Sequence, residues 1–105
     1  MDMLELKENR LVVRLPEELD HHRTEEIRCR IDQTVKSKPV DEVEFDFSRT
    51  AFMDSAGIGM LIGRYKIMKV LGGRICLTHM NRQIQRILSL SGIQKFMQLE
   101  REESI

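Results

Sequence analysis

The sequence predicts an α/β fold: a small mixed β-sheet of four to five strands packed with helices, in the order β-β-α-β-α-β-α-β. Three observations carry this prediction. Short apolar runs with a two-residue period alternate with longer stretches whose apolar residues recur every three to four positions. That alternation implies crossover connections and a largely parallel sheet, which an opening hairpin makes mixed. The length of 105 residues fits a single domain spanning 1–105.

The first segment predicts the hairpin. Leu4 and Leu6 alternate with charged side chains, as in a half-buried strand, and residues 11–15 form a second apolar run. Residues 8–9 supply the turn between the two strands. Pro16 ends the second strand, because proline has no backbone N–H to donate to a sheet.

Residues 22–36 predict the first helix. Ile27, Ile31 and Val35 recur every four residues and therefore share one face. Asp20 stands just before this helix, where a carboxylate can cap the free N–H groups and complement the helix dipole.

A third strand is predicted at residues 43–47, where apolar side chains alternate with polar ones. The clearest helix follows at residues 55–71, and glycines 72–73 end it. Its predicted buried face consists of Ile58, Leu61, Ile62, Tyr65 and Met68.

Residues 74–78 predict a fourth strand. Asn81 can cap a third helix, which Gly92 closes. Residues 96–99 predict a last short strand, and residues 101–105 are expected to fray.

Composition excludes several classes of protein. No apolar run approaches the ~20 residues that a membrane span needs, and the charged N-terminus lacks the apolar core of a signal peptide. Cys29 and Cys76 are too few and too far apart for a secreted disulfide scaffold, so we expect a cytoplasmic protein with reduced thiols. Aromatic residues make up 5% of the chain, with no Trp, which argues against direct nucleic-acid binding.

The net charge of zero hides an asymmetry. Residues 1–50 carry 13 acids and 9 bases, whereas residues 51–105 carry 4 acids and 8 bases. No acid occurs between Ser55 and Leu99, a stretch that holds seven bases. These bases are either solvated helix faces or a basic surface for an anionic partner or phosphate.

Two loops are expected at the carboxyl ends of the strands, where open α/β sheets place their sites. They cover residues 16–22 and 48–56. Their polar side chains include Asp20, His21, His22, Asp54 and Ser55.

The pair Asp54-Ser55 opens the long helix and has two interpretations. Most such pairs are simply N-caps. The same position also places a hydroxyl beside unsatisfied backbone N–H groups and a positive dipole end, which suits a covalently attached phosphate. The local sequence leaves both interpretations open.

Enzyme motifs are incomplete. A serine nucleophile elbow would need glycine where Met53 stands, and the acids after Ser55 all follow His79, so the hydrolase order of Ser, acid and His is absent. We therefore expect no catalytic residue.

Cofactor and metal motifs are also incomplete. The glycines within 57–63 have the spacing G-x-G-x-x-x-G, one residue too long for a dinucleotide fingerprint, and are better explained by close helix–sheet packing. The histidine pair 21–22 with two distant cysteines matches no zinc spacing. We expect neither a cofactor nor a metal.

Four stretches carry a family resemblance that covers essentially the whole chain. Residues 18–22 read Glu-Leu-Asp-His-His, 52–59 read Phe-Met-Asp-Ser-Ala-Gly-Ile-Gly, 63–66 read Gly-Arg-Tyr-Lys, and 72–73 read Gly-Gly. With these stretches the sequence resembles the STAS-domain anti-sigma factor antagonists, and most of all the stage II sporulation anti-sigma F factor antagonists.

The resemblance implies a binding protein rather than an enzyme, built on a small mixed sheet. Its partner would be an ATP-dependent anti-sigma factor that is also a serine kinase. The unmodified antagonist binds this kinase and frees the sigma factor; phosphorylation of the serine after the motif Asp, here Ser55, ends binding, and a PP2C-type phosphatase restores it. The implied partner-binding residues are Glu18, Asp20, His21, Asp54, Ser55, Ala56 and Gly57. The free protein would be a monomer.

Three positions depart from the family pattern. Glu17 stands where the family usually has Gly, Ala56 where it often has Ser or Thr, and the chain stops soon after Leu99, where relatives often carry a further helix. Two alternatives stay open: a ligand- or anion-sensing STAS module that is not phosphorylated, and a small hydrolase or nucleotide-processing enzyme. Sensing modules commonly lack the acceptor serine found here.

Overall fold

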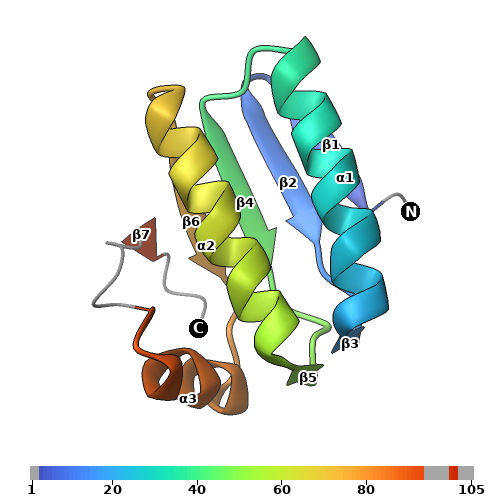
Figure 1. Cartoon of the computed structure of the whole chain (residues 1–105), viewed down its shortest axis with the longest axis vertical. Coiled ribbons are helices and arrows are strands. Elements are labelled where there is room, and N and C mark those ends of the chain that lie inside the picture. The colour runs from blue at the N-terminus through green and yellow to red at the C-terminus, as the bar shows by residue number, and fades with distance from the viewer. Residues whose placement is uncertain (1–2, 94–99, 102–105) are drawn as a thin grey trace.

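The computed structural model describes residues 3–93 and 100–101. Within them the predicted order of strands and helices is confirmed, with two short strands added (Figure 1). The elements are β1 (Leu4–Lys7), β2 (Arg10–Arg14), β3 (Glu18–Leu19), α1 (His21–Ser37), β4 (Glu42–Asp46), β5 (Phe52–Met53), α2 (Ser55–Val70), β6 (Arg74–Thr78), α3 (Arg82–Ser91) and β7 (Glu100–Arg101). The last strand predicted at 96–99 lies outside the described residues. Arg101, which was expected to fray, instead pairs with Leu77 as part of β7.

The main sheet is mixed, as predicted. Its strands lie in the order β1-β2-β4-β6-β7. β1 and β2 form the expected antiparallel hairpin, with Leu6 opposite Leu11, and the remaining neighbours pair in parallel. Parallel pairing aligns the carboxyl ends of β2, β4 and β6 at one edge, so the segments that follow these strands emerge at the same end of the molecule.

Helices α1 and α2 lie side by side across one face of this sheet (Figure 1). Val13, Phe45 and Leu77 occupy one row across β2, β4 and β6 and are fully buried. Ile27 of α1 and Leu61 of α2 belong to the same buried cluster. This apolar layer fixes where the two helices lie and therefore where they begin.

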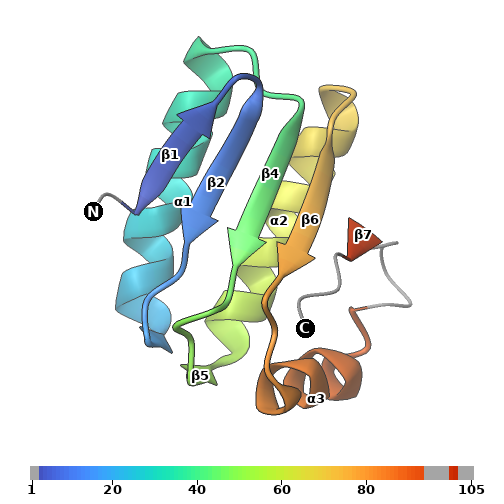
Figure 2. The same ribbon diagram turned by 180° about the vertical axis from the view of Figure 1, so that it is seen from behind.

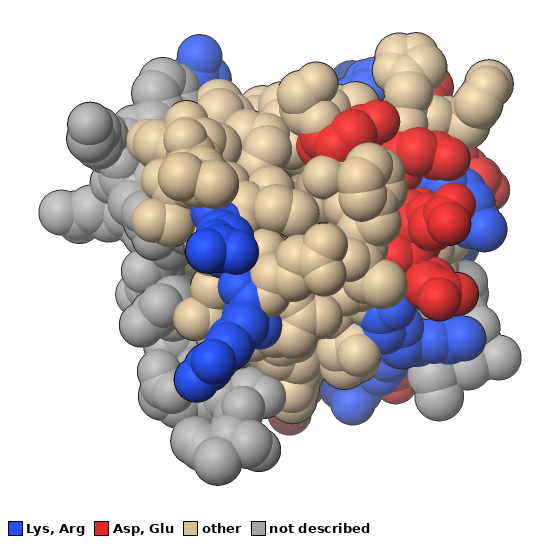
Figure 3. Space-filling view, turned by 90° about the horizontal axis from the view of Figure 1, so that it is seen from below, with Lys and Arg blue, Asp and Glu red and all other residues tan. Residues whose placement is uncertain are grey.

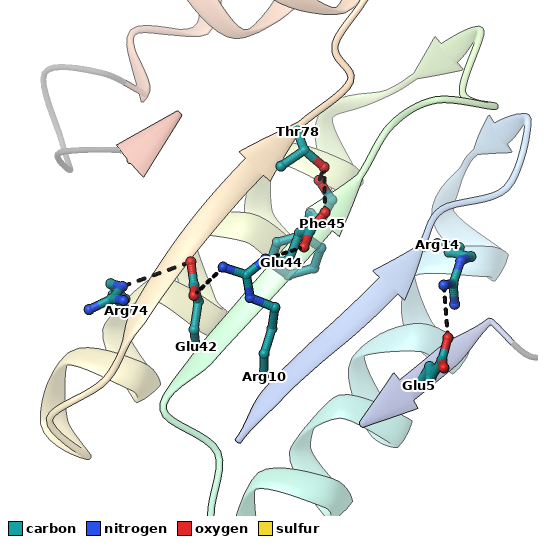
Figure 4. Close-up of polar contacts among 8 residues, drawn as sticks. All are labelled: Glu5, Arg10, Arg14, Glu42, Glu44, Phe45, Arg74 and Thr78. Carbon is teal, nitrogen blue, oxygen red and sulfur yellow. Dashed lines mark hydrogen bonds and ion pairs between the residues drawn. The ribbon is translucent and has the colours of Figure 1, made fainter. Parts of the chain in front are cut away.

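The opposite face of the sheet carries ion pairs in place of helices (Figures 2 and 4). Arg10 bridges two strands, because its guanidinium lies 3.0 Å from Glu42 Oε1 and 3.0 Å from Glu44 Oε1. The hydroxyl of Thr78 on β6 donates to Glu44 Oε2 at 2.8 Å. Among residues 3–93 and 100–101, charged side chains thus cover this face in place of a second helical layer.

A second, parallel sheet of β3 and β5 was not predicted. Leu19 pairs with Met53, and the backbone N–H of Ala51 donates to the Glu17 carbonyl at 2.8 Å. Each strand has only two residues, which is too short to show a sequence period. This sheet joins the two loops that were expected to carry the site.

Helix α2 corrects the predicted buried face. Gly57, Met60, Leu61, Arg64 and Met68 are the buried residues, whereas Ile58, Ile62 and Tyr65 are only partly buried. The prediction assumed one apolar stripe, but α2 contacts both the sheet and α1 and is apolar on several sides. A single helical period therefore could not identify the face.

The glycines of α2 behave differently from one another. A Cβ at Gly57 would lie 2.5 Å from Met53 Cγ, which confirms close packing at this position. A Cβ at Gly59 or Gly63 would meet nothing within 4 Å, so the packing explanation is wrong for those two. At the other end of the helix Gly72 adopts φ +83° and ends it as predicted.

Candidate functional site

Two helix starts lie next to each other at one end of the molecule. Asp20 directly follows β3 and precedes α1, and Asp54 directly follows β5 and precedes α2. Because β3 and β5 pair in parallel, both residues leave the small sheet at the same edge. The backbone N–H of Asp54 donates to the Leu19 carbonyl at 3.3 Å and extends this pairing. The expected meeting of the two loops is therefore confirmed.

Asp20 caps α1, as predicted. Its Oδ1 accepts a hydrogen bond of 3.0 Å from the Arg23 N–H, and its carbonyl accepts one of 2.9 Å from the Thr24 N–H. The helix begins at His21, one residue before the predicted start. The His21 side chain is exposed.

Asp54 caps α2 in the same manner. Its Oδ1 accepts a hydrogen bond of 2.9 Å from the Ala56 N–H, and its carbonyl accepts one of 3.0 Å from the Gly57 N–H. Ser55 is the first residue of the helix and is exposed. Its hydroxyl makes no hydrogen bond with any residue that the structure describes.

Gly57 lies beneath this surface. A Cβ there would come 2.5 Å from Met53 Cγ and 3.2 Å from Leu19 Cδ2, which are side chains of β5 and β3. The absence of a side chain lets α2 press directly onto the small sheet. Gly57 thus sets the position of Ser55 without offering a side chain to a partner.

The surface around the helix starts is unevenly charged. Figure 3 views the molecule from this end and shows acidic side chains gathered on one side, with some basic groups directly beside them and others across an uncharged surface. Glu17 and Glu18 are exposed here. Phe52, paired opposite Glu18, is 48% exposed, although large aromatic residues usually lie in the core. Sequence reasoning missed Phe52, because the exposure of its ring depends on contacts between segments that lie far apart in the sequence.

A groove of about 200 Å³ runs between α1 and α2 beside Ser55. His21 and Ala56 line it near the helix starts, and Arg64 lines it further along. Arg64 is 7% exposed; its Nε lies 3.1 Å from Asp32 Oδ1, and its Nη1 has no hydrogen-bond partner. Burial lowers the pKa of Arg64, and the charge of Asp32 offsets part of that effect. Sequence reasoning had counted Arg64 among the basic residues and in the family stretch 63–66, but had not predicted its burial.

Comparison with known proteins shows which family this chain belongs to. A model of the STAS domain matches residues 3–104. An anti-sigma F factor antagonist of Paenibacillus polymyxa is 34% identical over 87 residues, which cover 83% of this chain and 74% of the relative. This chain is a STAS-domain protein of the anti-sigma F factor antagonist family. A second such antagonist, from Lysinibacillus sphaericus, is 31% identical over 93 residues, covering 89% of this chain and 80% of that relative.

Solved structures agree with this assignment. The STAS domain described above matches the anti-sigma factor antagonist SpoIIAA in its unphosphorylated form, with a TM-score of 0.83 and 29% identity over 97% of this chain and 86% of that one. It also matches the Bacillus cell fate determinant SpoIIAA in its phosphorylated form, with a TM-score of 0.76 and 29% identity over 97% and 89% of the two chains. The murine anion transporter Slc26a9 shares the fold alone, at 18% identity, and the chain covers 16% of it.

The remaining candidate features of this STAS domain are scattered. Of the seven bases between Ser55 and Leu99, Arg64 is buried, Lys95 lies outside the described residues, and the other five are exposed on α2, β6 and α3. Within the described part of the chain, no three His, Cys, Asp or Glu residues are grouped to hold a metal. None of the helices there is long and apolar enough to cross a membrane.

Proposed function

We propose that this chain is a phosphorylation-switched antagonist of an anti-sigma factor. Residues 1–105 act as one STAS domain, monomeric when free, in the cytoplasm and without a cofactor. The unphosphorylated form binds an ATP-dependent anti-sigma factor serine kinase, which then releases its sigma factor. Phosphorylation of Ser55 ends binding, and a PP2C-type phosphatase restores it. The names of the relatives support the antagonist role, and the single observation that carries the switch is the exposed Ser55 hydroxyl at the start of α2.

The position of Ser55 suits a phosphate acceptor. A kinase needs access to the hydroxyl, and this hydroxyl is exposed and free of hydrogen bonds to described residues. Thr50, in the loop before β5, is 1% exposed and its hydroxyl donates to the Pro16 carbonyl at 2.9 Å, so it is a poor competitor. The helix N-terminus also favours the negative charge of the product.

The proposed contact surface surrounds that hydroxyl. Glu18, Asp20 and Asp54 supply acidic groups at the two helix starts, and the exposed ring of Phe52 supplies apolar area beside them. His21 and Ala56 extend the surface into the groove between α1 and α2. Gly57 contributes through the packing that holds α2 in place. A partner that fits this surface would carry basic groups around a small apolar pocket.

The switch requires no change of fold. Phosphorylation adds about −1.5 to −2 charges to a corner that already carries Asp20 and Asp54. A partner surface fitted to a neutral hydroxyl then meets a bulky dianion that it must desolvate. A hundredfold loss of affinity corresponds to about 2.7 kcal/mol, which such a burial can supply. The similarity of this chain to both the unphosphorylated and the phosphorylated SpoIIAA supports a fold that persists in both forms.

The hydrolase alternative finds little support in the geometry. It would need an acid–base pair beside Ser55, and the nearby acids are Asp20 and Asp54. Each of them already accepts a backbone hydrogen bond as a helix cap. A regulatory binding protein therefore fits the site better than an enzyme.

Incubation with the cognate kinase and Mg-ATP tests the proposal. Intact-mass and fragment spectra should show one added phosphate, located at Ser55. Ser48→Ala is the matched control, because Ser48 is an exposed serine in the loop before β5, and this variant should be phosphorylated normally. Ser55→Ala should bind the kinase without being released, and Ser55→Asp should bind poorly. Modification of Ser48 with Ser55 untouched, or turnover of a nucleotide or ester by this protein alone, would contradict the proposal.

A further inference from the structure

A separate cavity of about 350 Å³ lies where the end of β2, the start of α1 and the loop before β5 meet. This volume falls at the lower end of the range of roughly 300–1,000 Å³ that is typical of small-molecule pockets. Its charged lining consists of Arg14, Arg23, Arg49 and Glu17. Three arginines and one glutamate therefore line a single cavity, and none of the four residues belongs to the proposed contact surface.

Arg14 is held in place and incompletely satisfied. Its Nη2 donates to Glu5 Oε1 at 2.8 Å across the β1–β2 hairpin (Figure 4). Its Nη1 is buried and has no hydrogen-bond partner. A buried donor without an acceptor is unfavourable, so a shift of this guanidinium that brings Nη1 to an oxygen ligand would be favoured.

Arg23 and Arg49 bring two further positive charges to the same cavity. Both are exposed, and the side chain of neither forms an ion pair or hydrogen bond with a described residue. Their backbones are nevertheless fixed. The Arg23 N–H donates to Asp20 Oδ1 at 3.0 Å, and beside Arg49 the Thr50 hydroxyl donates to the Pro16 carbonyl at 2.9 Å. The two side chains thus extend from rigid points with all their donors available.

We propose that this cavity binds the phosphate group of a small molecule. A guanidinium presents several N–H donors in a planar fork that matches the oxygens of phosphate, and such charge-assisted hydrogen bonds are the strong ones. A tetrahedral dianion offers more acceptor oxygens and twice the negative charge of one carboxylate group, so it matches a cluster of three arginines better. The mutual repulsion of the arginines, opposed only by Glu17 in the lining, is relieved when a dianion binds. The ligand would contact the segment that leads into β3 and α1.

Amide chemical-shift titrations with inorganic phosphate and with pyrophosphate test this proposal, at constant ionic strength maintained with chloride. We expect saturable shifts around Arg14, Arg23 and Arg49, and tighter binding of pyrophosphate. The double variant Arg23→Gln/Arg49→Gln should keep its fold, because both side chains are exposed. It should bind pyrophosphate at least about tenfold more weakly, since it loses charge-assisted hydrogen bonds.

The matched control is Arg82→Gln/Arg86→Gln, which removes the same charge from exposed positions of α3 outside the cavity lining. This control should bind within about twofold of the wild type if local donors rather than overall charge hold the ligand. Shifts that do not saturate would overturn the proposal. So would equal weakening in the two double variants, or unchanged binding after Arg23→Gln/Arg49→Gln. Failure of the phosphate-binding proposal would not affect the proposed phosphorylation of Ser55, because the two experiments share no residue.

Discussion

The starts of α1 and α2 are built almost identically, yet they present different chemistry. Asp20 has φ −97° and ψ −175°, and Asp54 has φ −98° and ψ −173°; each carboxylate accepts a hydrogen bond from its own helix. Both follow two-residue strands that pair with each other. The cap therefore explains where both helices begin, but it cannot explain why only one of them would be a switch.

The difference lies in the residues after the caps. The first helical residue is an imidazole in α1, His21, and a free hydroxyl in α2, Ser55. The third is the exposed Arg23 in α1 and the buried Gly57 in α2. The start of α2 is thus pressed onto the small sheet and presents a hydroxyl at a fixed point, whereas the start of α1 carries long side chains in solvent. The cap determines where the first side chain of the helix lies, and the packing beneath the helix start determines how rigidly that side chain is held.

The largest expected effect comes from breaking the ion pair that joins the two helices. Asp32 on α1 holds the buried guanidinium of Arg64 on α2, with 3.1 Å between Oδ1 and Nε. Asp32→Asn leaves that charge without its partner and should lower the free energy of unfolding by about 3 kcal/mol. Urea denaturation measures this loss. The double variant Asp32→Leu/Arg64→Met should recover most of it, and a loss below about 1 kcal/mol in Asp32→Asn would mean that the pair behaves as an exposed one.

Gly57→Ala tests how closely α2 approaches the small sheet. The added methyl would overlap Met53, so we expect a net loss of about 1–2 kcal/mol, even though alanine is the better helix former. Gly59→Ala is the matched control, because its methyl enters open space and should stabilise the protein by about 0.5–1 kcal/mol. Urea midpoints of the two variants should move in opposite directions. A stabilising Gly57→Ala would show that this helix start is not tightly packed.

Removing each cap in turn tests whether the two caps stabilise the protein equally. Asp20→Ala and Asp54→Ala should each lower the free energy of unfolding by about 1 kcal/mol, because each removes one side-chain hydrogen bond to a helix N–H. Denaturation should show nearly equal losses. Both variants should also weaken kinase binding, beyond what a lost cap explains. Unchanged phosphorylation of Asp20→Ala, together with a large loss of stability, would restrict Asp20 to its structural role.

The smallest expected effect is a pH dependence of stability that α1 contributes and α2 does not. Glu25 on α1 lies 2.7 Å from Arg28, and this hydrogen bond and charge lower the pKa of Glu25. The pair therefore stabilises the fold above the ordinary glutamate pKa, and that contribution disappears as the pH falls through the lowered value. Helix α2 contains no acid and has no such pair. Glu25→Gln should shift the urea midpoint slightly at neutral pH and not in acid; a shift that persists in acid would contradict the ion-pair explanation.

Much of the fold could be predicted because its elements are long enough to show a period. The alternation in β4 and the four-residue spacing of Ile27 and Ile31 in α1 each identified an element and its buried face. Helix α2 shows the limit of this reasoning. It is apolar on several sides, so the sequence identified the helix while the predicted face was wrong.

The sequence predicted where the candidate site lies, but not how its segments pair and which of its side chains are buried. The position of Asp20 before a helix predicted its cap, and a cap was one of the two interpretations of the pair Asp54-Ser55. The strand order predicted that their loops lie at the same edge of the sheet. The β3–β5 pairing was beyond reach, because two residues show no pattern. The same holds for the exposure of Phe52 and the burial of Arg64, which depend on contacts between segments far apart in the sequence.

Amide chemical shifts of the unphosphorylated and Ser55-phosphorylated protein test the central claim most directly, because each amide reports on its own surroundings. If the phosphate is accommodated at the start of α2 and acts by local repulsion, the two spectra should differ only around residues 16–22 and 53–58. The amides of β2 and β4 should coincide in the two forms. Widespread shifts through β2 and β4 would mean that phosphorylation rearranges the sheet, and the account of a switch with a fixed fold would be wrong.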